Sequence, residues 1–150
     1  MVQSIGWVAP ASAKEWAEEA GETAFLHRCG PLFQKAVLVV PSGPSRGWSV
    51  LRRAKAAGAM VTALCAPERA QDAREAGADA VMDPERQDPT CYRGAWAVIY
   101  DPAGRIGFAR AAPSLDQGGV YVTFSARWAD WARALVARLS GGPRLLRLRD

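Results

Sequence analysis

The chain has 150 residues, of which 49% are hydrophobic and 23% charged, and its net charge is +4. This length suits a single domain with its own core, and the composition argues against disorder. The 19 Lys and Arg residues are scattered among 15 acidic ones, the histidine is single and the three cysteines are widely spaced. We therefore expect no nucleic-acid partner, no His-rich metal centre and reduced thiols.

Hydrophobic runs are all too short to cross a bilayer, and no leader-like pattern opens the chain. The sequence thus predicts a cytoplasmic protein with no membrane partner. Residues 1–34 form a lead-in segment, with a helix expected from Ser12 to Gly30 that carries acidic residues in its early turns. His27 lies on this helix without an evident catalytic partner, so we interpret it as a packed or surface residue.

Short apolar runs then alternate with Ala-rich helical stretches across residues 35–150. This alternation is typical of an α/β domain in which a doubly wound parallel sheet of six strands carries helices on both faces. The chain shows no repeat or linker that would divide it, which predicts one domain. The six expected strands are Ala36–Val40, Ala59–Cys65, Ala80–Met82, Ala95–Tyr100, Gly119–Phe124 and Arg144–Arg149.

Three helices are expected between the strands. Those at 49–58 and 67–77 each end at a glycine, Gly58 and Gly77, which suits a helix C-terminus. The third, at 126–139, places Trp128, Trp131 and two leucines on one face, which we interpret as core packing.

The loop after the first strand reads PSGPSRGW, residues 41–48. An α/β nucleotide-binding domain places glycines at this point so that the backbone can approach a pyrophosphate. Further landmarks follow in order: AKAAGA at 54–59, AGADAVMD at 76–83, VIYDPAG at 98–104 and LDQGGVYVTF at 115–124. From about Thr23 to Arg149 the sequence resembles the medium-chain dehydrogenase/reductase superfamily, in its quinone-oxidoreductase-like branch.

The resemblance implies a Rossmann-like cofactor-binding domain. It also implies that the GroES-like catalytic domain of the family is absent from these residues, and that two copies pair into a homodimer through the edge strand 144–149. Tryptophans such as Trp7, Trp16 and Trp48 are candidates to cover the surface that a missing domain would leave.

The loop departs from the family pattern in its glycines. Alignment places Pro41 and Pro44 at the first two glycine positions and leaves only Gly47 in place, while Trp48 replaces a small hydroxyl residue. Proline offers no N–H to a phosphate and adds a ring where the backbone must come close. Two hypotheses stay open: an anion is still held at the helix N-terminus, or the prolines and Trp48 fill the pocket. The candidate binding residues are Ser42, Gly43, Ser45, Arg46 and Gly47.

Two further residues are candidates for the site. Arg69 follows the second strand, where the resemblance implies contact with the cofactor ribose and a basic residue favours NADPH; it is equally interpretable as a solvated helix residue. Asp101 follows the fourth strand beside the expected crevice and is the best catalytic acid/base candidate. The cofactor prediction is therefore none or NADPH, with a small-molecule ligand as the partner.

Three functions compete. The first is a non-redox domain that binds, isomerises or cyclises a small hydrophobic substrate in a tryptophan-lined crevice at the carboxyl edge of the sheet. The second is a divergent NADPH-dependent oxidoreductase that acts with a partner or as a dimer. The third is a pseudo-enzyme that binds another protein.

Overall fold

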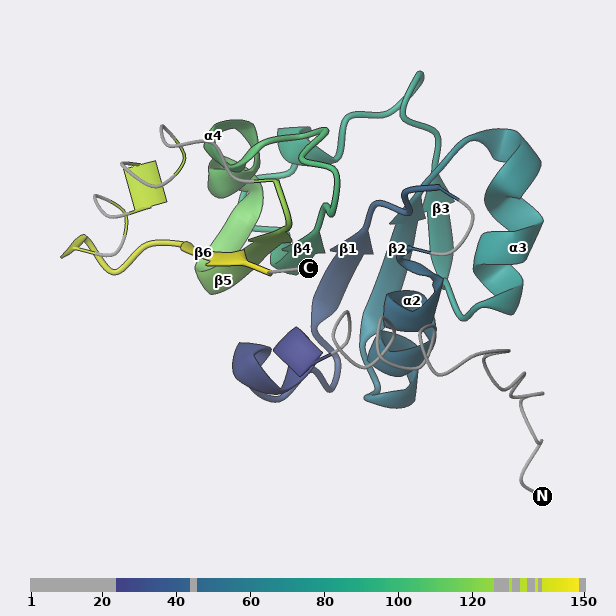
Figure 1. The fold of residues 1–150 in the computed structure, drawn as a ribbon, viewed down its shortest axis with the longest axis horizontal. Helices are drawn as coiled ribbons and strands as arrows, with labels where there is room; N and C mark the ends of the chain where they lie inside the picture. The colour runs from purple at the N-terminus through teal and green to yellow at the C-terminus, as the bar shows by residue number, and fades with distance from the viewer. Residues whose placement is uncertain are drawn as a thin grey trace.

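Six parallel strands form one sheet in a computed structural model, which describes residues 24–43, 46–125, 130, 133–134, 137 and 139–148. The strand order is β3-β2-β1-β4-β5-β6, and Figure 1 shows the strands side by side from β6 at the left to β3 at the right. All five neighbouring pairs are parallel. The strands are β1 (Ala36–Val39), β2 (Met60–Leu64), β3 (Ala80–Met82), β4 (Trp96–Tyr100), β5 (Leu115–Thr123) and β6 (Arg144–Arg147).

Strand β1 lies between β2 and β4 in the middle of the sheet, and both of its faces are covered. Val37, Leu38 and Val39 are fully buried, as expected for a parallel strand with a continuous apolar run. The chain leaves β1 toward β2 and β3 on one side and returns to β4, β5 and β6 on the other. This reversal places a crevice beyond the carboxyl ends of β1 and β4, where ligands bind in folds of this kind.

Two hydrophobic clusters fill the two faces of the sheet. On one face, side chains from β1, β2, β4 and β5 pack with residues of α2 and α3. On the other, Leu38, Ile99 and Tyr121 pack with Phe108 and Ala111 of α4. Helices on both faces of the parallel sheet were predicted and are confirmed. The helices are α2 (Trp48–Ala56), α3 (Ala70–Glu75) and α4 (Phe108–Ala111), and the 3-10 helices are η1 (Ala24–Cys29), η2 (Pro67–Arg69), η3 (Pro89–Cys91) and η4 (Ala112–Ser114).

Strand boundaries differ from the prediction mainly in β5. It starts at Leu115 rather than Gly119, because Leu115 pairs with Trp96 across a register shift that the local pattern does not reveal. The helix expected at 67–77 begins as the 3-10 helix η2 and continues as α3.

The lead-in helix expected from Ser12 is described only in its last part, which is the 3-10 helix η1. Residues 1–23, with Trp7 and Trp16, lie outside the described residues, as do Trp128 and Trp131 of the helix expected at 126–139. Within that expected helix, Ala134 is described and packs against the second cluster. No helix in the described part of the chain is long and apolar enough to span a membrane.

Candidate functional site

The loop between β1 and α2 folds back on itself. Ser42 and Arg46 form an isolated antiparallel bridge, in which the N–H of Ser42 donates to the carbonyl oxygen of Arg46 at 3.0 Å. Gly47 follows with φ of 96°, and a Cβ built there would lie 3.0 Å from the Cα of Pro41. Glycine is therefore required at 47, because the backbone is left-handed and closely approached. The bend brings the chain directly into α2 at Trp48.

Trp48 occupies the first turn of α2 and is only 8% exposed. Its indole Nε1 is buried and has no hydrogen-bond partner among the described residues. The guanidinium carbon of Arg69, from η2, lies 4.5 Å from the centroid of the Trp48 ring, within the range of a cation–π contact. Arg69 also donates through Nη1 to the carbonyl oxygen of Gly43 at 3.1 Å. The Arg69 side chain thus connects the end of β2 to the β1–α2 loop across Trp48.

The other loop residues predicted from sequence have different surroundings. The guanidinium of Arg46 lies 4.5 Å from the ring centroid of Phe124, which follows β5. Ser45 lies outside the described residues, as does Pro44. Of the described candidates in the loop, Arg46 therefore lies against Phe124, and neither Ser42 nor Arg46 lines the crevice beyond the carboxyl ends of β1 and β4.

A crevice with a volume of about 510 Å³ opens at the carboxyl edge of the sheet. Three of the residues considered from the sequence line it, namely Gly43, Trp48 and Arg69. Four other candidates are outside its lining: Ser42, Arg46, Gly47 and Asp101. Cys65 lines it too, and burial raises the pKa of this thiol, which is therefore a neutral part of the wall. The remaining lining residues are Val40, Pro41, Leu64, Ala66, Pro84, Glu85, Arg86, Gln87, Asp88, Pro89, Arg105, Ile106 and Arg110.

The lining is more basic than the sequence predicts. Arg69, Arg86, Arg105 and Arg110 all contribute to it. Among the described tryptophans, Trp48 alone lines the crevice, whereas the hypothesis of a hydrophobic substrate implied a tryptophan-lined pocket. The sequence reasoning missed Arg86, Arg105 and Arg110, although each follows β3 or β4, and loops that follow parallel strands meet at this edge.

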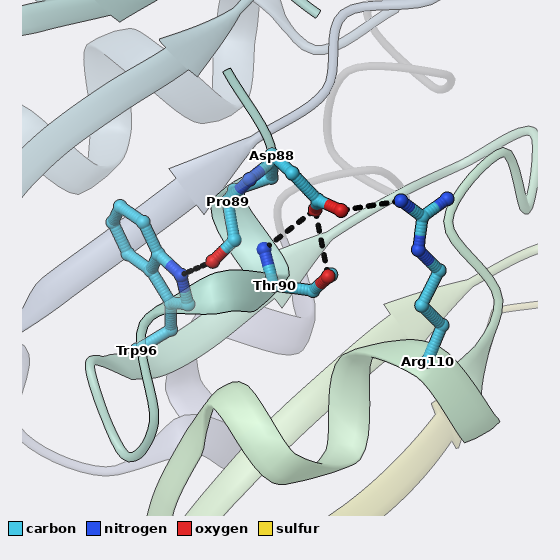
Figure 2. Close-up of polar contacts among 5 residues, drawn as sticks. All are labelled: Asp88, Pro89, Thr90, Trp96 and Arg110. Atoms are coloured by element: carbon cyan, nitrogen blue, oxygen red, sulfur yellow. Dashed lines mark hydrogen bonds and ion pairs between the residues drawn. The ribbon is translucent and has the colours of Figure 1, made fainter.

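The wall of the crevice between β3 and α4 is held by Asp88, the N-cap of η3. Its carboxylate accepts from the backbone N–H of Thr90 at 2.9 Å and from the Thr90 hydroxyl at 2.6 Å, and it pairs with Arg110 of α4 (Figure 2). The Thr90 hydrogen bonds, followed by Arg110, lower the pKa of Asp88 to about 2. Trp96 at the start of β4 donates from Nε1 to the carbonyl oxygen of Pro89 at 2.9 Å (Figure 2), and this bond ties the same loop to the sheet.

Asp101 is fully buried behind the crevice. Its carboxylate accepts from the backbone N–H groups of Arg105 at 2.9 Å, Ile106 at 2.8 Å and Gly107 at 3.4 Å, and from the Tyr121 hydroxyl at 2.7 Å. Burial raises the pKa of Tyr121, and the negative charge of Asp101 raises it further, so the phenol remains a donor. These contacts make Asp101 the organiser of the loop that presents Arg105 and Ile106. The predicted acid/base role of Asp101 stays a prediction.

The sheet order and the crevice define the class of fold, which is a doubly wound Rossmann-like domain. Solved structures with this fold include a putative alcohol dehydrogenase from Sinorhizobium meliloti 1021 (TM-score 0.71, 19% identity, 95% of this chain and 44% of that chain). They also include the quinone oxidoreductase from Coxiella burnetii (TM-score 0.69, 19% identity, 86% and 41%). Mycobacterial Rv1454c, solved in complex with NADPH, matches with a TM-score of 0.64 and 26% identity, over 93% of this chain and 49% of that chain.

The chain spans less than half the length of these solved structures. No family model matches the sequence, and no curated protein gives a significant match. The solved structures confirm the predicted Rossmann-like fold, which this chain shares with an alcohol dehydrogenase-like structure and a quinone oxidoreductase.

A dinucleotide of the kind this fold implies does not fit the loop in the ordinary way. Such a ligand needs free backbone N–H groups and an open path beside the helix N-terminus. Pro41 has no N–H, and the N–H of Ser42 donates to Arg46 within the loop. Trp48 fills the first turn of α2 and is covered by Arg69. We therefore assign no chemical step to a nicotinamide cofactor.

Proposed function

We propose that this domain binds a small organic molecule in the crevice at the carboxyl edge of the sheet, in a role other than hydride transfer. The observation that carries the proposal is the arrangement of Gly43, Trp48 and Arg69. A buried indole covered by a guanidinium, which is itself hydrogen-bonded to the loop, occupies the path of a diphosphate while the rest of the crevice stays open. Its volume, about 510 Å³, is in the range of small-molecule pockets.

The test is a pair of calorimetric titrations on the purified chain. NADPH at millimolar concentration should give no saturable heat, because Pro41 has no N–H, the N–H of Ser42 is used within the loop and Trp48 fills the first turn of α2. 1-Naphthol, a neutral bicyclic probe, should bind weakly through the apolar wall formed by Leu64, Pro89 and Ile106.

Two variants locate the probe. Ile106→Trp places a large ring in the crevice and should abolish naphthol binding, whereas Met60→Trp adds the same ring at a position that is 59% exposed and outside the crevice, and should leave it intact. Micromolar NADPH binding by the unmodified chain would overturn the proposal, and so would a naphthol affinity that is unchanged in Ile106→Trp.

A second candidate is a divergent NADPH-dependent oxidoreductase that acts with a partner or as a dimer. It is favoured by the likeness to Rv1454c, whose structure is described as complexed with NADPH, and by the position of Arg69 in η2, the element that follows β2. The same NADPH titration separates the two functions.

A further inference from the structure

The charges that line the crevice are unevenly compensated. Three of its four arginines have carboxylate partners in the described structure: Arg69 lies 3.9 Å from Asp72, Arg86 lies 3.8 Å from Asp83, and Arg110 pairs with Asp88. Arg105 is different, because no carboxylate of the described residues lies within 4.0 Å of its guanidinium and its side chain makes no hydrogen bond there. One basic group at the crevice is therefore available to a ligand.

The backbone that carries Arg105 is fixed, although its side chain is exposed. The N–H groups of Arg105 and Ile106 both donate to the buried carboxylate of Asp101, and Tyr121 holds that carboxylate from the neighbouring strand. Gly104 turns the loop with φ of 67°, and a Cβ there would lie 2.9 Å from the carbonyl oxygen of Ser125. A guanidinium on so rigid a base loses less entropy when it binds an anion.

An apolar surface lies next to Arg105 in the crevice lining. Ile106 follows it in the chain, the buried Pro89 belongs to the connection between β3 and β4, and Leu64 ends β2 with Cys65 directly after it. Trp48 and Arg69, which are in contact with each other, also line the crevice. The lining therefore suits a ligand with one anionic group and an apolar body, and does not suit a diphosphate.

We propose that Arg105 binds the oxyanion of the ligand, a phosphate or a carboxylate, while the apolar body of the ligand lies against Ile106, Pro89 and Leu64. This inference rests on the proposed function, because it names the class of ligand for the same crevice. Arg–oxyanion pairs form two parallel, charge-assisted hydrogen bonds, which a neutral isostere cannot form.

The test compares three bicyclic probes by calorimetry: 1-naphthyl phosphate, 1-naphthoate and the neutral 1-naphthol. The unmodified chain should bind at least one of the two anions about tenfold or more tightly than naphthol. The anion whose affinity exceeds that of naphthol by the larger factor indicates whether the natural ligand carries a phosphate or a carboxylate. The preference should weaken as salt is raised, because the guanidinium is exposed.

Matched variants identify the binding residue. Arg105→Gln should abolish the preference for the anions and leave naphthol binding unchanged, Arg105→Lys should keep part of it, and Arg52→Gln, an exposed arginine of α2 outside the crevice, should keep all of it. Thermal melting checks that each variant is folded.

Failure of this inference and failure of the proposed function give different results. Equal binding of naphthol and both anions, or an anion preference that survives Arg105→Gln, overturns the role of Arg105 and leaves crevice binding standing. Absence of binding by all three probes overturns the ligand class. Micromolar NADPH binding overturns the proposed function itself.

Discussion

At the scale of single residues, the Asp101 carboxylate shows how burial decides what an ionisable group does. A buried charge is stable only when hydrogen bonds replace the water that it has lost. Asp101 obtains three of these bonds from the turn at 105–107 and the fourth from Tyr121, which is twenty positions away in the sequence. The side chain is therefore a positioning group for the loop that carries Arg105.

Replacement of Tyr121 tests this role. Tyr121→Phe removes one donor from a buried carboxylate, so we expect the free energy of unfolding to fall by about 1.5 to 3 kcal/mol in urea denaturation. The control is Tyr92→Phe, because Tyr92 is 51% exposed and its loss should change stability by less than about 0.5 kcal/mol. Equal effects of the two substitutions would contradict the role that we give to Tyr121 and Asp101.

At the scale of elements, the long connection from β3 to β4 is held by polar contacts more than by a helix. Asp88 caps η3 and reaches Arg110 of α4, while Trp96 anchors the same segment through Pro89 (Figure 2). Residues of this connection and Arg110 of α4 both line the crevice. The Asp88–Arg110 pair thus links two elements whose relative position determines the shape of the crevice.

The stabilising effect of Asp88 should depend on pH. Its folded pKa of about 2 lies below the ordinary value of 3.8, so its contribution is complete above about pH 4 and is lost as the pH falls toward 2. Asp88→Ala should lower the free energy of unfolding by about 1 kcal/mol near neutral pH. The deficit relative to the unmodified chain should shrink between about pH 4 and pH 2.

Urea denaturation at several pH values measures this deficit. Glu85→Ala, an exposed carboxylate in the same connection, is the control and should change stability by less than about 0.5 kcal/mol. A deficit of Asp88→Ala that stays constant down to pH 2 would show that the cap does not act through its charge.

At the scale of the whole molecule, the sheet has two edges, β3 and β6. β6 has two half-buried leucines flanked by Arg144 and Arg147 and lies at the end of the sheet farthest from β3 (Figure 1). No strand of the described residues pairs with the outer side of β6, and a sheet edge of this kind offers backbone groups to a second chain. The dimer that the sequence predicts through strand 144–149 would use this edge.

A proline on β6 tests the dimer. Leu148 donates its N–H to the carbonyl oxygen of Thr123, so alternation along the strand turns the N–H of Arg147 to the outer edge. We expect the unmodified chain to sediment as a dimer, Arg147→Pro as a monomer, and Arg147→Ala as a dimer, because only proline removes the outward donor. A monomeric unmodified chain would refute the prediction.

The order of the six strands and the helices α2 and α3 could be read from local patterns, whereas α4 and the 3-10 helices η3 and η4 were not predicted. Strands buried on both faces must be continuously apolar, as in Ala36–Val39 and Trp96–Tyr100. The turns that follow α2 and α3 need a residue that accepts a left-handed backbone, and Gly58 and Gly77 supply it. The departure of the loop from the glycine pattern was equally visible, because Pro41 and Trp48 change both the donors and the bulk of the bend. Such features depend on neighbours in the sequence, and the sequence alone therefore determined them.

What gathers at the crevice was decided only by the tertiary structure. Arg69 lies over Trp48, Asp88 pairs with Arg110, and Tyr121 donates to Asp101, each across at least twenty positions of the chain. The partner of a charged or polar side chain depends on which loops meet at the sheet edge and on which groups lose their water there. Those conditions arise only when the strands are assembled, which is why Arg105 could not be distinguished from the other arginines before its surroundings were known.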